Sequence, residues 1–379
     1  MKEENGTVEK EERDKREVRY ERDERDERGK GRNETIEKEL ERKKGKKRKQ
    51  KETSKRKEMR YEAKRITAEE YGRLFPSPNH IFNSVAFNEL NKHKAAAVHY
   101  LAIMDDSKTR FGIVLGEREA EGIKTLSSPF SAPFGSFMTN STQRLESMEA
   151  AVDALRAYAQ KVGARVKIAL TPDVYDRSQT AKWVNVLSRK ATLHHLDLNY
   201  FFKLDHVTPY EQIISRSARK NLHNALKHEW RFTLLDTSSE RDIERAYNLI
   251  ALNRKEHGYP LRMSFHDVVA TTHVVNALFF VLETKSDAAH DTWTDVAAAQ
   301  VFHVAKDTAQ VIYWGDLAAY SHLRTMNRLA AFMYDHFSRL GVRILDIGPS
   351  TEDGEPNYGL CSFKEDIGCE VCTKHVFVF

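Results

Sequence analysis

The sequence predicts an α/β protein of two halves, each a mixed sheet flanked by helices, behind a charged N-terminal segment. Short apolar segments typical of strands recur beside longer segments whose apolar residues repeat every three or four positions, the period of a helix. The order of these elements in the second half repeats the order in the first. At 379 residues the chain is long enough for two domains of ordinary size.

Charge is unevenly distributed along the chain. Residues 1–65 hold 26 Lys and Arg against 19 Asp and Glu, whereas the whole chain has a net charge of +5. The remainder is therefore close to neutral. A dedicated nucleic-acid-binding domain carries a basic field, so this composition excludes that class for the folded part.

Cysteine content and hydropathy indicate a cytoplasmic protein. Three cysteines cannot form a disulfide framework for a chain of this size, which indicates a reducing compartment. We find no apolar run near the roughly 20 residues that a membrane-spanning helix needs, and no apolar core of a signal peptide. We therefore expect a cytoplasmic protein without a membrane span.

Residues 1–60 consist mainly of charged residues and offer little to bury. We expect this segment to be disordered, because it cannot offset the entropy lost on ordering. Residues 42–57 include 11 Lys and Arg, enough to attract RNA or anionic lipid, and a solvated tail without a role is the alternative. Composition changes abruptly at Met59, so a natural start at Met59 is a further hypothesis.

The first half, residues 61–205, is expected to begin with helices and to continue with alternating strands and helices. Thr67 and the residues up to Glu70 have the character of an N-cap and first turn. The aromatic, Pro- and Gly-rich segment 127–137 is too irregular for a central strand and is expected to line a groove. The expected elements are helices from Thr67 to before Pro76 and at 83–92, strands at 97–104 and 110–115, a helix at 142–162, a strand at 166–170, a helix at 178–187 and a strand at 193–204.

The second half, residues 206–379, is expected to begin with one helix at 208–229 that has an apolar face and an opposite basic stripe. The apolar positions are Ile214, Ala218, Leu222 and Ala225, and the basic ones are Arg216, Lys220, His223 and Lys227. The stripe is either a solvated surface or a site for anionic groups. Helices at 240–256 and 265–277, a strand at 278–283, a hairpin of 295–305 and 310–314, a helix at 320–340, a strand near 342–347, a polar loop and a final strand at 372–379 follow.

The stretch from Leu345 to Gly368 carries a family resemblance. It contains Asp-x-Gly at Asp346 and Gly348, then Asn-x-Gly-Leu-x-x-Phe-Lys from Asn357 to Lys364, then Gly368. This pattern resembles the FemAB-like acyltransferases, a branch of the GNAT superfamily. The resemblance implies two GNAT-like halves and an acyl- or aminoacyltransferase that acts on an amine without a covalent enzyme intermediate. It also implies an acceptor such as a cell-wall precursor or an amino sugar of a polysaccharide.

Within this stretch the resemblance makes Lys364 and Tyr358 candidate catalytic residues. The Lys364 ammonium could stabilise the oxyanion that forms when an amine attacks an acyl carbonyl. Asn357 could orient substrate or form a turn, and Phe363 is a candidate contact. Asp346 is either a base for the amine or, as we favour, a residue that ties down the loop through backbone N–H groups.

Two further segments contribute candidate substrate-binding residues. The family shows a Ser-x-x-x-Arg segment that joins its halves, and here Ser215 and Arg219 match it, with Asn221 close by. The resemblance implies that Arg219 contacts an anionic part of the substrate. Trp314 ends a strand where acetyl-CoA-dependent GNAT proteins bind pyrophosphate, but the usual Gly-containing signature is absent from residues 316–324.

The donor and acceptor remain open at this stage. The donor is either an acyl-CoA or an aminoacyl-tRNA, and the acceptor is a small molecule, potentially nucleotide-linked. The alternatives are an ordinary acetyl-CoA-dependent N-acetyltransferase and a non-catalytic protein that binds RNA or a nucleotide sugar. We expect no metal, because Cys369 and Cys372 point to opposite faces of a strand and lack a second pair of ligands.

Overall fold

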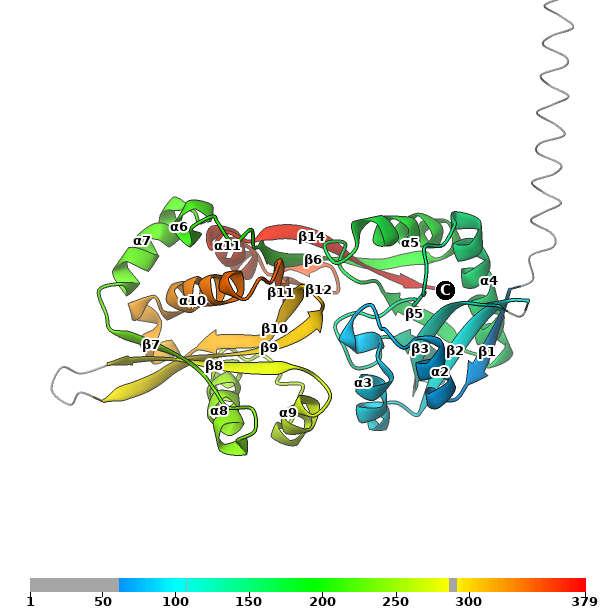
Figure 1. Cartoon of the computed structure of the whole chain (residues 1–379), viewed down its shortest axis with the longest axis horizontal. Coiled ribbons are helices and arrows are strands. Elements are labelled where there is room, and N and C mark those ends of the chain that lie inside the picture. Colours follow the sequence, from blue (N-terminus) through cyan, green and yellow to red (C-terminus); the bar gives the residue numbers. More distant parts are fainter. Residues whose placement is uncertain (1–60, 107, 286–291) are drawn as a thin grey trace, which may run out of the picture. The chain divides into compact units, whose positions relative to one another are not determined.

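The computed structural model describes residues 61–106, 108–285 and 292–379, and these form a mixed α/β fold (Figure 1). The predicted disordered segment 1–60, with its basic portion, lies outside the described residues. The first half comprises β1 (Tyr61–Ile66), α2 (Ala68–Leu74), η1 (Ile81–Asn83), α3 (Val85–Leu90), η2 (Lys92–Lys94), β2 (Ala97–Asp105), β3 (Lys108–Ala120), β4 (Ile123–Ser128), α4 (Leu145–Lys161), β5 (Arg165–Ala169), α5 (Arg177–Lys190) and β6 (Thr192–Lys203).

The second half repeats this order after two linking helices. The linking helices are α6 (Tyr210–Ile213) and α7 (Arg216–Ala225). The repeat comprises β7 (Trp230–Leu234), α8 (Glu240–Glu256), α9 (Phe265–Thr272), β8 (Ala277–Lys285), β9 (Trp293–Ala305), β10 (Thr308–Asp316), η3 (Ala318–Leu323), α10 (Thr325–Arg339), β11 (Ile344–Pro349), the short pair β12 (Thr351–Glu352) and β13 (Glu355–Pro356), α11 (Tyr358–Asp366) and β14 (Glu370–Val378).

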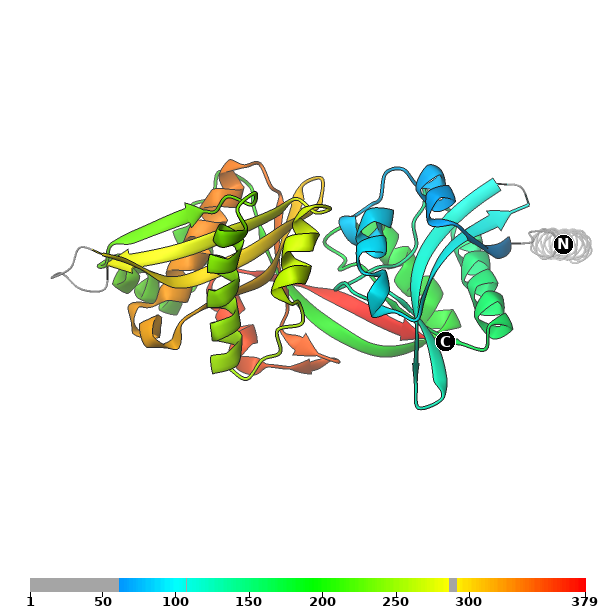
Figure 2. The same ribbon diagram turned by 90° about the horizontal axis from the view of Figure 1, so that it is seen from below.

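A 12-stranded sheet runs through both halves of the described chain. Its strand order is β1-β2-β3-β4-β5-β14-β6-β11-β10-β9-β8-β7. The last strand, β14, pairs with β5 of the first half, and β6 of the first half pairs with β11 of the second. Figure 2 shows β6 and β14 passing side by side between the halves. Each half therefore completes the sheet of the other, and the predicted boundary near residue 205 falls just after one of the exchanged strands.

Helices cover the sheet with the apolar faces that the sequence predicted. In α4 the residues Met148, Val152 and Leu155 are fully buried against the first half of the sheet, and Met333 and Phe337 of α10 are buried against the second. Three-and-four spacing places such residues on one side of a helix. Burial of these side chains supplies the main driving force for the packing of helices on the sheet.

Two sequence predictions near the candidate site are wrong. The helix predicted for residues 208–229 is two helices, because Ser215 has extended backbone and its side chain caps α7 by accepting a hydrogen bond from Ala218 N–H. Part of the predicted polar loop is helix α11, which Asn357 caps in the same way. The strands β1, β4 and β7 were not predicted. Two of them, β1 and β7, are sheet edges, where polar residues interrupt the apolar pattern.

Candidate active site

The two central strands of the second half separate at their carboxyl ends. β10 and β11 run parallel, but their register pairs Thr308 with Ile344, Ala309 with Leu345 and Gln310 with Asp346, and then stops. β10 continues to Asp316 alongside β9. β11 turns away at Gly348, whose φ of +77° is easy for glycine and costly for other residues. The end of β10 is therefore free of its parallel neighbour.

Helix α11 brings an aromatic side chain and a lysine to this place. Phe363 packs against Trp314 of β10, with 6.5 Å between the ring centroids. Both side chains are half-buried, so their remaining surface can contact a bound molecule. The structure thus brings together two of the candidate substrate-binding residues that lie 49 positions apart in the sequence.

Lys364 is buried beneath the loop that ends β11. Its side chain is 2% exposed, and Nζ donates to the carbonyl oxygens of Ile347 (3.1 Å), Gly348 (2.9 Å) and Pro349 (3.0 Å). An ammonium group has three N–H donors, so all three are used within the protein. Burial lowers the pKa of Lys364 to about 8. A direct contact with an oxyanion would require Lys364 to give up one of these bonds.

Asp346 lies at the centre of a second buried cluster. The carboxylate is fully buried and accepts hydrogen bonds from Gly348 N–H (2.8 Å), Asn199 Nδ2 (2.8 Å), Gln310 Nε2 (2.8 Å) and Tyr175 Oη (2.7 Å). Burial raises the pKa of Asp346, whereas these donors act in the opposite direction. The bond to Gly348 is the loop-tying contact that we favoured from the sequence, and the carboxylate has no exposed surface for substrate.

The N-terminus of α11 is exposed, and residues of α8 and of the segment that follows α8 support it. Asn357 Oδ1 accepts from Leu360 N–H (3.0 Å), and its Nδ2 donates to Tyr259 Oη (3.2 Å). The guanidinium of Arg254 lies 5.7 Å from the Tyr259 ring centroid. Tyr358 is 78% exposed and starts the helix that carries Phe363. Asn357 therefore caps α11, as the turn interpretation allowed.

Asp316 places a titratable carboxyl at the free end of β10. Alternate residues of a strand face the same side, so Asp316 and Trp314 share the face that meets Phe363. Burial raises the pKa of Asp316 to about 6. Between them, Gly315 lets α8 approach the strand, because a Cβ there would lie 2.2 Å from Asn253 Oδ1. Asn253 Nδ2 donates to the Asp316 carbonyl oxygen (2.7 Å), which fixes the strand end.

The remaining candidates lie on α7. This helix contacts α11 through Ser217 Oγ, which donates to Asp366 Oδ2 (2.9 Å). Arg219 is exposed, and its Nε and Nη2 donate to the Glu211 carbonyl oxygen (3.2 and 2.8 Å) of α6. Asn221 is half-buried. Arg219 and Asn221 thus belong to the helix next to the site, and the Arg219 guanidinium is bonded to α6 instead of to Lys364.

Sequence reasoning missed four residues that shape this site. Tyr175, Asn199 and Gln310 hold Asp346 from three other elements, and Arg254 supports Tyr259. No local sequence signal identifies such partners, because they meet only when the sheet forms. Among the described residues, no group of three or more His, Cys, Asp or Glu side chains is placed to hold a metal ion.

Solved structures of other proteins have the same arrangement of helices and strands. Their sequence identity to this chain is 12% or less, so the similarity shows a shared fold alone. FemX has a TM-score of 0.59 at 12% identity over 83% of this chain and 96% of its own. The chain therefore has the fold of FemX. L-PGS from Bacillus licheniformis matches with a TM-score of 0.52 at 10% identity, over 83% of this chain and 92% of its own.

A protein of unknown function from Bacteroides thetaiotaomicron also shares this fold, with a TM-score of 0.51 at 9% identity, over 84% of this chain and 99% of its own. No protein-family model matches the sequence, and no curated protein matches it. In the part of the chain that the structure describes, no helix is long and apolar enough to cross a bilayer. The similarity shows a shared fold, so the activity and the substrates are argued from the site.

Proposed function

We propose that this protein transfers an acyl or aminoacyl group directly to an amine at the free end of β10. The observation that carries the proposal is the combination found there: Trp314 and Phe363 form an aromatic contact, and Asp316, two residues further along β10 than Trp314, has a carboxyl pKa raised to about 6. A base with a pKa near the working pH is suited to take a proton from an attacking amine.

The residues of the site support direct transfer of the acyl group from donor to amine, without a covalent enzyme intermediate. The amine nitrogen forms a bond to the acyl carbonyl carbon, and the bond from that carbon to the leaving oxygen or sulfur breaks. Asp316 accepts the proton that the amine loses and returns it to the leaving hydroxyl or thiol. Trp314 and Phe363 hold the apolar part of the substrates, so that positioning contributes to the rate.

Lys364 fits the role of a positioning residue in this proposal. Its three bonds to the carbonyl oxygens of residues 347–349 set the conformation of the loop beside the site. Its buried positive charge also favours negative charge developing nearby. Tyr358, at the exposed start of α11, and Asn357 are proposed to contact the acceptor.

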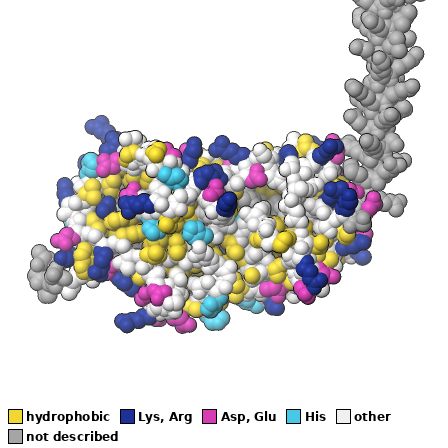
Figure 3. Space-filling view, viewed as in Figure 1, with side chains coloured by type: hydrophobic (Ala, Val, Ile, Leu, Met, Phe, Trp, Pro, Cys, Tyr) yellow, Lys and Arg dark blue, Asp and Glu magenta, His cyan; other side chains and the backbone are white. Residues whose placement is uncertain are grey.

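For the donor we propose an aminoacyl-tRNA in preference to an acyl-CoA. GNAT proteins that use CoA need free backbone N–H groups near the start of the helix after this strand. Here Ala318 N–H, the first in η3, already donates to the Glu256 carboxylate (3.0 Å), and a carboxylate repels pyrophosphate. Exposed Lys and Arg side chains on the α7 surface, including Arg216, Arg219 and Lys220, could contact a polyanion (Figure 3).

The acceptor that we propose is an amine on a small molecule, such as a nucleotide-linked cell-wall precursor or an amino sugar of a polysaccharide. The test uses residues 59–379 and measures thermal stabilisation by aminoacyl-tRNA, by acetyl-CoA and by a UDP-linked amino-sugar peptide, followed by transfer of a labelled acyl group. Stabilisation and transfer with aminoacyl-tRNA support the proposal. Transfer from acetyl-CoA alone would make the protein an ordinary N-acetyltransferase, and binding without transfer would make it a binding protein.

A further inference from the structure

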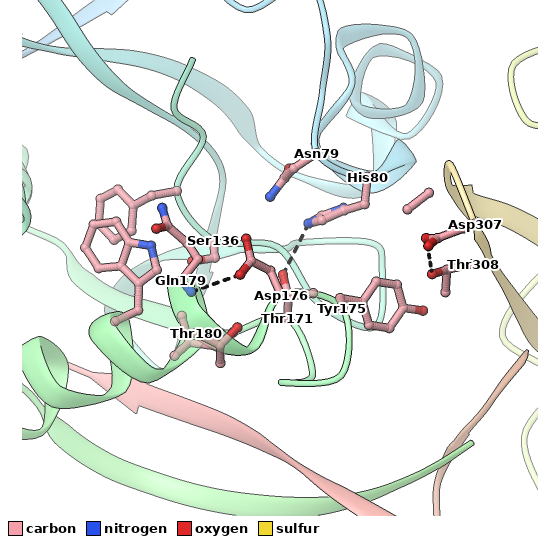
Figure 4. A pocket seen from close by; sticks show the side chains of 14 residues that line it. Asn79, His80, Ser136, Thr171, Tyr175, Asp176, Gln179, Thr180, Asp307 and Thr308 are labelled. Atoms are coloured by element: carbon pink, nitrogen blue, oxygen red, sulfur yellow. Dashed lines mark hydrogen bonds between the residues drawn. The ribbon is translucent and has the colours of Figure 1, made fainter. Parts of the chain in front are cut away.

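A cavity of about 160 Å³ is lined mainly by residues of the first half, and its wall includes none of Trp314, Asp316 and Phe363. It opens at the carboxyl end of β5 and is lined by the loop after β4, the first turns of α5, the segment before η1 and the turn from β9 to β10 (Figure 4). Its labelled wall residues include Asn79, His80, Ser136, Tyr175 and Gln179. The groove expected from the irregular segment 127–137 thus exists, with Ser136 and Phe137 in its wall.

This cavity occupies the place in the first half that the candidate active site occupies in the second. β5 leads into α5 as β11 leads into α11. Asp176 caps α5 by accepting from Gln179 N–H (3.0 Å), and Asn357 caps α11 by accepting from Leu360 N–H (3.0 Å). The repeated order of elements therefore gives the protein two sites at equivalent strand ends, with different side chains in each.

Three buried polar groups in the cavity wall have no hydrogen-bond partner among the described residues. They are His80 Nδ1, Ser136 Oγ and Trp183 Nε1, and each of the three residues is at most 5% exposed. They come from three separate elements and line one space. Buried polar groups in native proteins nearly always have a partner, so three orphans around a cavity indicate that something in the cavity supplies hydrogen bonds.

The charge of the wall excludes an anionic occupant. None of the 14 lining residues is Lys or Arg, and two of them, Asp176 and Asp307, carry carboxyl groups. Burial lowers the pKa of His80 to about 3, so its imidazole is neutral. A phosphate or carboxylate would meet no positive charge here, unlike the basic surface of α7. Both carboxylates already have partners, because Asp307 accepts from Arg343 Nε (2.6 Å) and Asp176 from Gln179 N–H, so the wall favours an uncharged occupant.

The wall also has an aromatic side. Phe137 and Trp183 stack with 4.2 Å between ring centroids and 13° between ring planes, and both line the cavity. A ring that carries hydroxyl groups and has an apolar face fits such a wall. Its apolar face can pack on the aromatic residues, and its hydroxyl groups can pair with the separate polar groups. The volume is below the usual range of about 300–1,000 Å³ for drug-sized ligands, which limits the occupant to one small ring.

We propose that this cavity binds a single uncharged sugar ring, whose hydroxyl groups pair with His80 Nδ1, Ser136 Oγ and Trp183 Nε1. The ring packs its apolar face on the aromatic side of the cavity. Tyr175, which lines the cavity, donates to Asp346 through its Oη, so the occupied wall is joined to the loop at the candidate active site. This proposal stands independently of the transferase reaction.

The test measures binding of glucose, N-acetylglucosamine and glucose 6-phosphate to residues 59–379 by saturation-transfer NMR and titration calorimetry. We expect the two neutral sugars to bind and the phosphorylated sugar to bind at least tenfold more weakly. Trp183→Phe keeps the aromatic wall and removes the donor, and Ser136→Gly suits the φ of +100° at that position. Each variant is expected to weaken binding about tenfold, the loss of one hydrogen bond.

The matched control is Trp293→Phe, which changes a tryptophan on β9 that does not line the cavity. Equal binding by wild type and both cavity variants would overturn the proposal, as would tighter binding of the phosphorylated sugar. Failure of both neutral sugars to bind at millimolar concentration would also overturn it and leave water as the occupant. Circular dichroism of each variant confirms that the fold is retained before binding is compared.

Discussion

Tyr175 and Asp346 are 171 positions apart in the sequence, and Tyr175 Oη donates to Asp346 Oδ2 at 2.7 Å. Tyr175 precedes α5 of the first half, and Asp346 lies in β11 of the second. The bond joins the first-half cavity to the loop that Lys364 holds. The bond also supplies a donor to a carboxylate that has no access to water, so loss of the bond affects both halves of the described fold.

Tyr175→Phe should lower the free energy of unfolding by about 1.5–3 kcal/mol, the usual value of a hydrogen bond to a charged group. Chemical denaturation measures this difference. Tyr334→Phe is the matched control, because Tyr334 Oη donates to the neutral carbonyl oxygen of Thr208 (3.0 Å), and its expected cost is about 0.5–1.5 kcal/mol. Equal costs in the two variants would mean that the link to Asp346 has no special importance.

Lys364→Met should remove activity and lower the free energy of unfolding by about 3 kcal/mol, because three carbonyl oxygens lose their donor in a buried place. Lys374→Met is the control. Lys374, on β14, is also buried and pairs with Asp197 (3.0 Å), a carboxylate that accepts from Thr351 and Gly354, whereas Lys364 holds the carbonyl oxygens of residues 347–349. The control should lose stability and keep the turnover of the protein that remains folded. If both variants kept the same turnover, the positioning role of Lys364 would be refuted.

Asp316→Asn should make the protein more stable at pH 7 by about 1–3 kcal/mol, since a shift of one pKa unit corresponds to about 1.4 kcal/mol. The folded-state pKa of about 6 lies above the ordinary value of 3.8. The folded state therefore binds the proton more tightly than the unfolded state does. The contribution of Asp316 to the free energy of unfolding of the wild type falls as the pH rises from about 4 to 6. Unfolding of both proteins at pH 4 and pH 7 checks this, and a difference that does not change with pH would contradict it.

Gly315→Ala should destabilise the protein by about 1–3 kcal/mol, because a Cβ would lie 2.2 Å from Asn253 Oδ1 and would force α8 away from β10. Gly72→Ala provides a control of opposite sign. Gly72 is in helix α2, where the nearest heavy atom to an added Cβ is 3.6 Å away, and alanine should stabilise that helix by about 0.5–1 kcal/mol. Thermal unfolding distinguishes the two, and a stabilised Gly315→Ala would show that the close approach has no consequence.

Local signals in the sequence were sufficient for the elements that they govern. Helix α8 has the predicted bounds, Glu240–Glu256, and Thr67 caps α2 as predicted, with Glu70 completing a capping box. Helix α11 was missed because Gly359 and Pro356 suggested a loop, whereas the Asn357 cap and the burial of Lys364 and Ile367 stabilise a helix there. Propensity yields to tertiary packing in such places.

The site could be predicted as a region and not as a set of contacts. The family pattern drew attention to Lys364 and Phe363, and the strand end before the long helix drew attention to Trp314. The structure places the three residues on adjoining elements. The partners of Lys364 are backbone oxygens 15 to 17 positions away, and backbone oxygens leave no mark in a sequence. Asp316 has a raised pKa because the folded chain buries it, which residue type alone does not disclose.

The most direct test of the account compares the rates of acyl transfer by wild type, Asp316→Asn and Asp335→Asn. Asp335 lies on α10 and its carboxyl pKa is also raised by burial, so the control repeats the same chemical change elsewhere. The account predicts that Asp316→Asn loses roughly 10²-fold or more in kcat/KM, the usual contribution of a general base, while Asp335→Asn keeps the wild-type rate. Equal rates for Asp316→Asn and wild type would contradict transfer at the end of β10.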